Sequence, residues 1–328
     1  MPRRRLMSFV VAAAFLWPLS PSAQQHTTPI VGFLTSGSQA ALDKRWMAAF
    51  HRGLAEAGYV DGQNVTVDYR AADDRYDRLP ALAAELVRNK VAVIVAAGGP
   101  VSALAAKKAS DTVPIVFTTI ADPVKSGLVD GLSRPGGNAT GTAGLTSELD
   151  SKRLELLHQI KPSARVIGVL VNPNRPGVDA NNKELLDAAQ ALGCRLIFQN
   201  AGSEHPLDAA FDRLAEQKVD GVVVTADPFF NFRRAQVVAL AARHAMPAIY
   251  QWREFVADGG LMSYGPSIAD AYQQAGAYAG RIIKGARPED LPVMQPTRFE
   301  LVINQKTAKT LNIEVPSLLL ALANEVTE

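Results

Sequence analysis

The chain has 328 residues, of which 48% are hydrophobic, 20% charged and 7% aromatic, and it contains one cysteine. This composition excludes a disordered chain, a collagen-like repeat and a disulfide scaffold, and the length predicts two lobes, because a single core tends to stop growing near about 250 to 300 residues. The net charge of +2 arises from Arg3, Arg4 and Arg5. The rest of the chain is close to neutral, so charge gives no reason to expect nucleic acid or anionic lipid as a partner.

The N-terminus has the layout of an export signal. The three arginines precede an apolar run at residues 6–19 and small residues at 20–23. The apolar run is shorter than the roughly 20 residues that a membrane-spanning helix needs. We therefore expect residues 1–23 to be a cleaved signal peptide and the mature chain to be periplasmic, with the general and the twin-arginine export routes both open. No cysteine lies near the cleavage point, so we expect no lipid anchor.

From residue 29 onward, short β-rich apolar runs alternate with longer segments of helical period, which predicts βαβ units and a mostly parallel sheet. The runs lie at residues 30–34, 65–69, 91–96, 114–117, 166–171, 195–198, 221–224 and 248–250. Each of the first four starts about 130 residues before its counterpart among the last four, which indicates one βα module used twice. The predicted fold class is α/β, with two three-layer αβα lobes built on parallel sheets.

Two short Gly-flanked segments, at 139–143 and 260–264, fall outside this repeat and close its two halves. We expect them to be hinge strands. A helix at 267–284, a link containing three prolines, a strand at 299–303 and a helical tail follow, so a third crossing between the lobes is implied. The first lobe is expected to consist of residues 29–143 with 266–291, and the second of residues 146–264 with 293–328.

Ligands of open parallel sheets bind at the carboxyl ends of the strands, where helix N-termini also lie. Polar, Gly-rich or Pro-bearing loops follow the predicted strands at that edge. The ligand-binding candidates are Ser36, Gly37, Gly98, Gly99 and Asp122 in the first lobe, and Asn172, Asn174, Asp227, Tyr250 and Tyr264 in the second.

Each candidate also has a purely structural interpretation. Gly98 and Gly99 suit a carboxylate at a helix start, or a plain tight turn. Serines here can hold the same anion or cap a helix. Each aspartate stands in an Ala-Asp-Pro sequence, which is typical of a helix cap as well as of ligand contact. The asparagines suit a polar ligand edge or an ordinary Asx turn. The aromatic residues after strand ends, Trp252 among them, can stack on a ligand, whereas Phe229 and Phe230 are assigned to packing.

The sequence lacks the motifs of several kinds of catalysis. It contains no dinucleotide fingerprint, P-loop or nucleophile elbow. The five histidines are scattered, with none at metal-ligand spacing, and Cys194 has no second cysteine to pair with. We therefore expect no cofactor, no metal and no enzymatic activity.

Many segments between residue 29 and the C-terminus match one known family. They are GFLTSGS at 32–38, GLAEAGYVDGQN at 53–64, RYDRLP at 75–80, LSRPGGN at 132–138, ADPFF at 226–230, AIY at 248–250, WREF at 252–255, LMSYG at 261–265, LPV at 291–293 and FELVIN at 299–304. In these segments the chain resembles the exported substrate-binding proteins of ABC transporters, specifically the tryptophan/tyrosine-type group. The resemblance implies the type I periplasmic-binding fold, in which two lobes are joined by a three-strand hinge. It also implies a ligand clamped between the lobes and its delivery to a membrane permease. Aromatic amino acids are known ligands of related members.

The sequence thus indicates a periplasmic, monomeric solute-binding component of an ABC importer that works with an inner-membrane permease. Its ligand is expected to be a small carboxylate-bearing solute, with an aromatic amino acid as one candidate. Closure of the hinge would hold the ligand. Two alternatives are a ligand-binding sensory module that docks on a membrane receptor and an exported enzyme that works through Asp122 and Asp227.

Overall fold

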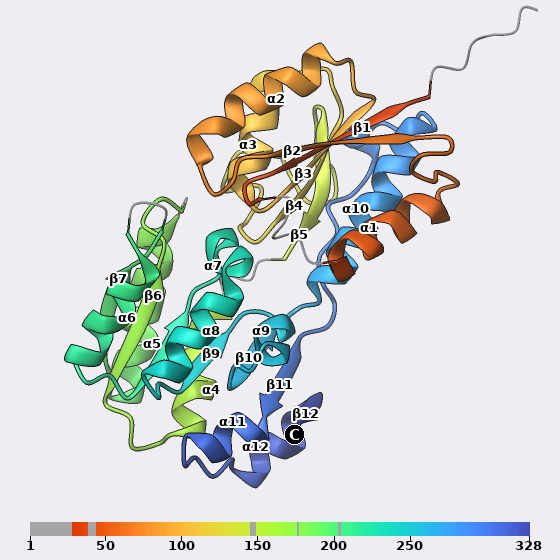
Figure 1. Cartoon of the computed structure of the whole chain (residues 1–328). Helices are drawn as coiled ribbons and strands as arrows, with labels where there is room; N and C mark the ends of the chain where they lie inside the picture. The colour runs from red at the N-terminus through yellow and green to blue at the C-terminus, as the bar shows by residue number, and fades with distance from the viewer. Residues whose placement is uncertain (1–27, 39–43, 145–148, 176, 203–204) are drawn as a thin grey trace, which may run out of the picture.

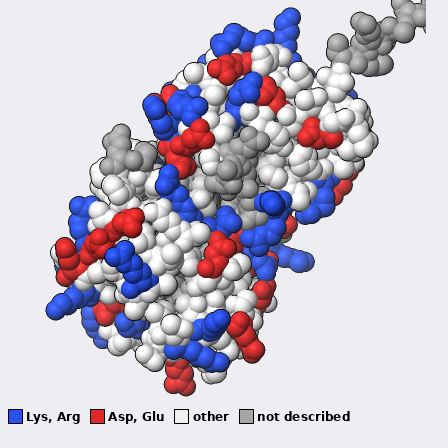
Figure 2. Space-filling model, in the orientation of Figure 1, with Lys and Arg blue, Asp and Glu red and all other residues white. Residues whose placement is uncertain are grey.

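The computed structural model describes residues 28–38, 44–144, 149–175, 177–202 and 205–328. The predicted signal peptide at 1–23 lies outside these residues. Within them the chain forms two α/β lobes joined at a narrow waist (Figure 1). Lys/Arg and Asp/Glu side chains are interspersed over both lobes on the face that Figure 2 presents. No helix in the described ranges is long and apolar enough to span a membrane.

The first lobe contains a five-stranded parallel sheet in the order β2-β1-β3-β4-β5. Its strands are β1 (Ile30–Thr35), β2 (Thr66–Ala71), β3 (Val93–Ala97), β4 (Ile115–Thr119) and β5 (Ala139–Ala143). Successive side chains of a strand point to opposite faces, and here both faces are apolar: Phe33 belongs to the cluster under one helical layer and Leu34 to the cluster under the other. The continuous Val/Ile runs therefore fold as strands covered on both sides.

Two helical layers sandwich this sheet. One consists of α2 (Leu79–Arg88), which follows the short 3-10 helix η2 (Tyr76–Arg78), and α3 (Pro100–Ala109). The other pairs α1 (Lys44–Glu56) with α10 (Ile268–Ile283), which returns from far along the chain. Glycines let α1 and α10 approach closely, since a Cβ at Gly276 would lie 2.1 Å from the carbonyl oxygen of Phe50. This contact positions the beginning of α10 at the edge of the sheet that faces the second lobe (Figure 1).

The second lobe repeats the arrangement and extends it. Its sheet has the order β12-β11-β10-β9-β8-β6-β7, so β7-β6-β8-β9-β10 reproduces the order of the first sheet. This confirms the two-fold pattern predicted from the strand spacing. The strands are β6 (Val166–Val171), β7 (Arg195–Asn200), β8 (Gly221–Val224), β9 (Ala248–Tyr250), β10 (Met262–Gly265), β11 (Glu300–Asn304) and β12 (Glu325–Thr327).

Helices also cover both faces of the second sheet. One layer contains α4 (Asp150–Ile160) and α5 (Val178–Leu192), with α11 (Gln305–Thr310) and α12 (Ser317–Leu322) beside them. The other contains α6 (Leu207–Glu216) and α8 (Arg234–Arg243). Two five-residue helices, α7 (Pro228–Phe232) and α9 (Arg253–Ala257), follow β8 and β9. Figure 1 shows α7 at the junction of the lobes.

The end of the chain differs from the prediction in two respects. β11 runs antiparallel to β10, because the chain re-enters the second lobe from the first, at the edge where the parallel strands end. The predicted helical tail also contains β12, which pairs with β11. Its three residues carry no apolar run that would have indicated a strand.

The crossings between the lobes begin after β5, after β10 at residues 266–267, and after the 3-10 helix η4 (Pro288–Asp290) at residues 292–299. The first and third are tied together at their starts, where Ala143 N donates to Met294 O at 2.9 Å and Met294 N donates to Gly141 O at 2.9 Å. These bonds fix where the crossings begin on the first lobe.

Candidate ligand-binding site

A cavity of about 480 Å³ lies between the lobes at the carboxyl edges of both sheets. The first lobe contributes the β3–α3 turn, the ends of β4 and β5, and residues of α1 and α10. The second lobe contributes α7 and Trp252 in front of α9, and the third crossing supplies residues 294–298. The volume lies within the roughly 300–1,000 Å³ that is usual for small-molecule sites.

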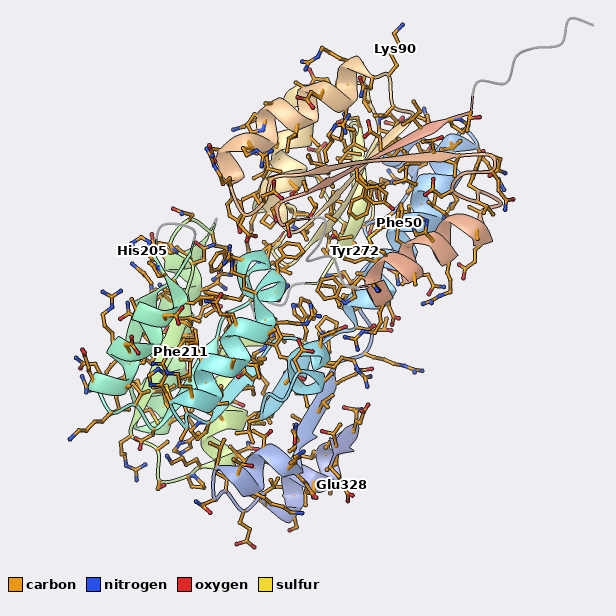
Figure 3. The ribbon with its side chains drawn as sticks, in the orientation of Figure 1. Phe50, Lys90, His205, Phe211, Tyr272 and Glu328 are labelled. Atoms are coloured by element: carbon orange, nitrogen blue, oxygen red, sulfur yellow. The ribbon has the colours of Figure 1, made fainter. Side chains whose placement is uncertain are left out.

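Four aromatic side chains line this cavity. Trp46 and Tyr272 come from α1 and α10, with ring centroids 5.8 Å apart, and Phe232 and Trp252 come from the second lobe. Figure 3 shows Tyr272 at the end of α10 that faces the second lobe, whereas Phe50 lies within the first. Aromatic walls from both lobes suit a flat, apolar ligand that is enclosed from two sides.

Two polar atoms in the cavity wall lack a hydrogen-bond partner among the described residues. They are Oγ1 of Thr142, at the end of β5, and Nε1 of Trp252, and both residues are buried. A buried polar group without a partner costs about 1–3 kcal/mol. A ligand that accepts from the indole N–H and bonds the hydroxyl would remove this cost.

The β3–α3 turn presents backbone to the cavity. Gly98 and Gly99 have φ of 79° and 91°, a left-handed conformation that favours glycine, and α3 begins directly after them at Pro100. Ser36 Oγ donates to the carbonyl oxygen of Gly98 at 2.7 Å and holds the turn. A Cβ at Gly99 would lie 2.7 Å from the Pro228 ring of the second lobe, so only glycine allows the lobes to approach this closely here.

The predicted first-lobe residues therefore divide into three groups. Gly98 and Gly99 line the cavity. Ser36 and Gly37 lie beside it, Ser36 under the glycine turn and Gly37 against Phe232 of the second lobe. Asp122 is not among the described residues of the wall. Its Oδ1 accepts from Val124 N at 2.9 Å and Lys125 N at 3.2 Å, which is the capping arrangement.

The predicted polar residues of the second lobe lie behind the cavity and bond to one another. Asn172 Nδ2 donates to Asp227 Oδ1 at 3.0 Å, and Asn172 Oδ1 accepts from Asn174 N at 3.1 Å, as in an Asx turn. Asp227 also caps α7 by accepting from Phe229 N at 2.8 Å. Burial raises the pKa of Asp227 to about 6, although the hydrogen bonds from Asn172 and Phe229 oppose the shift. Asn172, Asn174 and Asp227 thus support the wall, and the described lining does not include them.

The two predicted tyrosines are also absent from the described lining. Tyr250 is buried, with its ring 4.7 Å from that of Phe255. Tyr264 stacks on Phe299 at 6.2 Å, and its carbonyl oxygen accepts from Arg153 Nε at 2.8 Å. Both residues sit at strand ends as predicted, but the Tyr250 ring packs inside the lobe and the half-buried Tyr264 ring packs against the exposed Phe299.

Two buried polar pairs lie in the second lobe, one at the cavity wall and one near the crossings. Asn231 lines the cavity, and its Oδ1 accepts from Gln251 Nε2 at 2.5 Å. Deeper in the lobe, Arg153 forms an ion pair with Asp150 at 2.5 Å. Because Asp150 follows the first crossing and Arg153 also holds the carbonyl of Tyr264 before the second, this pair fixes the two crossings relative to each other.

The lobes touch each other beside the cavity, so the conformation is closed. Trp46 Nε1 donates to Glu254 Oε1 at 3.0 Å across the junction, within a buried contact. The Arg234 guanidinium lies 5.5 Å from the Trp46 ring centroid. A wall residue of the first lobe is therefore held by two residues of the second.

Sequence reasoning missed most of the wall. Trp46 and Tyr272 lie on helices, where an apolar side chain at helical spacing indicates core, and both also belong to the core of the first lobe. Phe232 and Thr142 were not selected, although Thr142 ends a predicted hinge strand. The sequence did indicate Trp252, because it is an aromatic residue that follows a predicted strand. Thr118 and Thr119 also line the cavity, and their position at the end of β4 is the signal that could have found them.

Comparisons with known proteins give a consistent result. Residues 35–327 match the family described as ABC transporter substrate binding protein. A tyrosine-binding protein of Clostridioides difficile strain R20291 is 30% identical over 274 residues, covering 84% of this chain and 78% of that protein.

Solved structures agree. A conserved domain protein from Vibrio cholerae superimposes with a TM-score of 0.83 at 28% identity, and an ABC domain in complex with L-Trp from Streptococcus pneumonia with a TM-score of 0.81 at 26%; each covers 92% of this chain and 100% of its own. A ligand-free, open substrate-binding protein from Clostridium difficile, also 26% identical, gives a TM-score of 0.61, covering 88% of this chain and 96% of its own. At equal identity, the present lobe arrangement is thus more similar to that of the ligand-bound protein.

Proposed function

The chain belongs to the family of ABC transporter substrate-binding proteins, and from this premise we propose that it is the periplasmic solute-binding component of an ABC importer and that its ligand is an aromatic amino acid. The observation that carries the ligand class is the wall of the inter-lobe cavity, with aromatic rings from both lobes beside two buried polar atoms that lack a partner in the described chain. Two relatives support it by the ligands in their names, tyrosine and L-Trp.

The charged ends of an amino acid find complementary groups at the first lobe. The glycine turn Gly98–Gly99 precedes α3, and the positive end of a helix dipole favours a carboxylate there. Asp270 lines the same cavity from the first turn of α10 and supplies a carboxylate for an ammonium group. We therefore expect the ligand to carry both charges.

Closure explains how such a protein serves import. The lobes enclose the ligand, and the permease receives it when they open, so the ligand leaves chemically unchanged. The predicted export signal and the family support this role. The alternative of an exported enzyme depended on Asp122 and Asp227, and neither belongs to the described lining of the cavity. No specific observation favours the sensory alternative.

The test is calorimetric titration of the mature protein with L-tryptophan, L-tyrosine and L-phenylalanine, with L-leucine and indole as controls. We expect one-to-one binding of at least one aromatic amino acid, with indole much weaker because it lacks both charges. A ligand at 100 times its Kd should add about 2.7 kcal/mol to the unfolding free energy. If none of the three aromatic amino acids binds, the proposed ligand class is wrong.

Trp252→Phe gives a sharper test of the site. It keeps a ring but removes the indole N–H, so affinity should fall if the ligand accepts from that group. The control is Phe299→Leu, a substitution of an exposed aromatic residue outside the described lining, which should leave affinity unchanged. Mass spectrometry of the released ligand should show it unaltered, and uptake should require the partner permease.

A further inference from the structure

Helix α7 connects the cavity to a second junction between the lobes. Pro228, Asn231 and Phe232 of α7 line the cavity. The residues that flank the helix, Asp227 at its N-cap and Arg233 at its C-cap, instead contact the first lobe. Figure 1 shows α7 projecting toward the first lobe at the waist.

The first of these contacts is an ion pair. Arg233 donates from Nε at 3.1 Å and from Nη2 at 3.0 Å to Oδ2 of Asp74 in the first lobe. Both partners are held in place: Asp74 N donates to Ser36 O at 2.9 Å, and the Arg233 guanidinium lies 5.0 Å from the Phe229 ring centroid. The Asp74 side chain is only 12% exposed, so the pair is partly shielded from solvent.

The second contact lies at the other end of α7. Tyr76 of η2, in the first lobe, places its hydroxyl 3.5 Å from Oδ1 of Asp227. Asp227 keeps two further partners inside its own lobe, Asn172 and the Phe229 N–H. Loss of the tyrosine hydroxyl would therefore leave the cap of α7 in place.

These four residues share one property. Asp74, Tyr76, Asp227 and Arg233 contact across the lobes, yet none is among the described residues that line the cavity. Because each contact joins residues of opposite lobes, separation of the lobes at this point breaks both. An interaction confined to the closed state raises the fraction of molecules that are competent to hold the ligand, and the apparent affinity rises with that fraction.

We propose that Asp74–Arg233 and Tyr76–Asp227 form a closure latch that sets the ligand affinity of this protein without contacting the ligand. The four are positioning residues that act through α7. The proposal rests on the proposed function in that ligand binding accompanies closure.

The test compares two neighbouring aspartates. Asp73 and Asp74 both have left-handed backbones, at φ of 55° and 63°, which asparagine tolerates well. Asp73 pairs with Arg78 inside the first lobe at 2.6 Å. Asp73→Asn is therefore the matched control for Asp74→Asn, since each removes one paired charge and only the latter pair crosses the lobes.

L-tryptophan and L-tyrosine serve as calorimetric probes. We expect Asp74→Asn to raise the Kd of whichever probe binds about fivefold, the size of a well-placed, partly shielded ion pair, through faster dissociation, while Asp73→Asn stays within twofold. Arg233→Gln should have the same effect, and the double variant should be no worse than either single one, because the two residues act as a pair. Tyr76→Phe should weaken binding about threefold. Thermal unfolding without a probe should change equally for the two aspartate variants.

If neither probe binds, the proposed ligand class is refuted but the latch is not. Small-angle X-ray scattering of the ligand-free protein then tests the latch. In that case Asp74→Asn should increase the radius of gyration of the protein and Asp73→Asn should leave it unchanged. Equal Kd values for Asp74→Asn and Asp73→Asn, additive losses in the double variant, or, without a binding probe, equal radii of gyration would each overturn the latch.

Discussion

Gly37 offers a substitution that acts on the closed conformation alone. The residue lies at the end of the β1 loop, and a Cβ built on it would lie 2.2 Å from Cδ2 and 2.5 Å from Cγ of Phe232 in the opposite lobe. Its φ is outside the left-handed region, so alanine does not strain the backbone. Gly37→Ala should therefore leave the separate lobes intact and obstruct their closure.

The size of the effect follows from the overlap. Relief requires movement of a ring that is itself packed between the lobes, and an extra methyl group in such a place costs typically about 1–3 kcal/mol. Because each 1.4 kcal/mol is roughly a factor of ten, the ligand affinity of Gly37→Ala should fall about 5- to 150-fold. Without a ligand the lobes can separate and relieve this overlap, so the ligand-free protein should unfold close to the wild-type temperature or slightly above it, since alanine restricts the unfolded chain.

Titration calorimetry with L-tryptophan or L-tyrosine, paired with thermal unfolding of the ligand-free protein, measures both quantities. Phe232→Leu shortens the obstructing side chain, so Gly37→Ala should cost less affinity in that background than in the wild type. Wild-type affinity in Gly37→Ala would refute the reasoning. So would an equal loss in both backgrounds, or a large loss of stability without ligand, which would place the effect inside the first lobe.

Three further predictions concern other contacts. The pKa of Asp227 is raised from its ordinary 3.8 to about 6 in the folded protein. The resulting contribution to stability is therefore complete below pH 3.8 and is lost as the pH rises through 6. Chemical denaturation at pH 7 and pH 5 should show the wild type gaining about 1 kcal/mol of unfolding free energy at the lower pH, relative to Asp227→Asn. Gly276→Ala should lower the unfolding free energy by at least about 2 kcal/mol, because its Cβ would meet helix backbone at 2.1 Å, whereas Gly131→Ala, at 3.5 Å from its neighbour, should change little. Trp46→Phe removes the buried donor to Glu254. It should weaken ligand binding about tenfold, because a buried acceptor without a partner costs about 1–3 kcal/mol. Adding Glu254→Gln to the same chain should reduce this loss.

The fold was predictable because its signals are local. Unbroken Val/Ile runs such as the one in β3 give strands buried on both faces, and the repeated spacing gives the same strand order in both lobes. β12 carries no such signal. It becomes a strand only because β11 offers it a free edge, and β11 lies there only because the chain returns from the first lobe. That dependence on a distant crossing is not encoded in three residues.

The site was predictable only in part, because position at a strand end says nothing about which polar atoms remain available. Asn172 and Asp227 follow β6 and β8, which are neighbours in the sheet, and their side chains form a hydrogen bond with each other. That bond, together with the cap on α7, uses the atoms that a ligand would need. Gly98 and Gly99 line the cavity with their backbone, and they have no side-chain polar atoms that other residues could occupy.

Closure itself divides the polar groups of the junction into two kinds. Glu254 and Asp74 acquire partners from the opposite lobe when the lobes meet, so they favour closure whether or not a ligand is present. Thr142 and Trp252 are buried in this conformation without a partner in the described chain, so they carry a free-energy cost until a ligand fills the cavity. The closed state is then favoured by the ligand that satisfies both atoms. A compound of the same shape without a hydrogen-bond acceptor should enter the cavity but shift the lobes less toward closure.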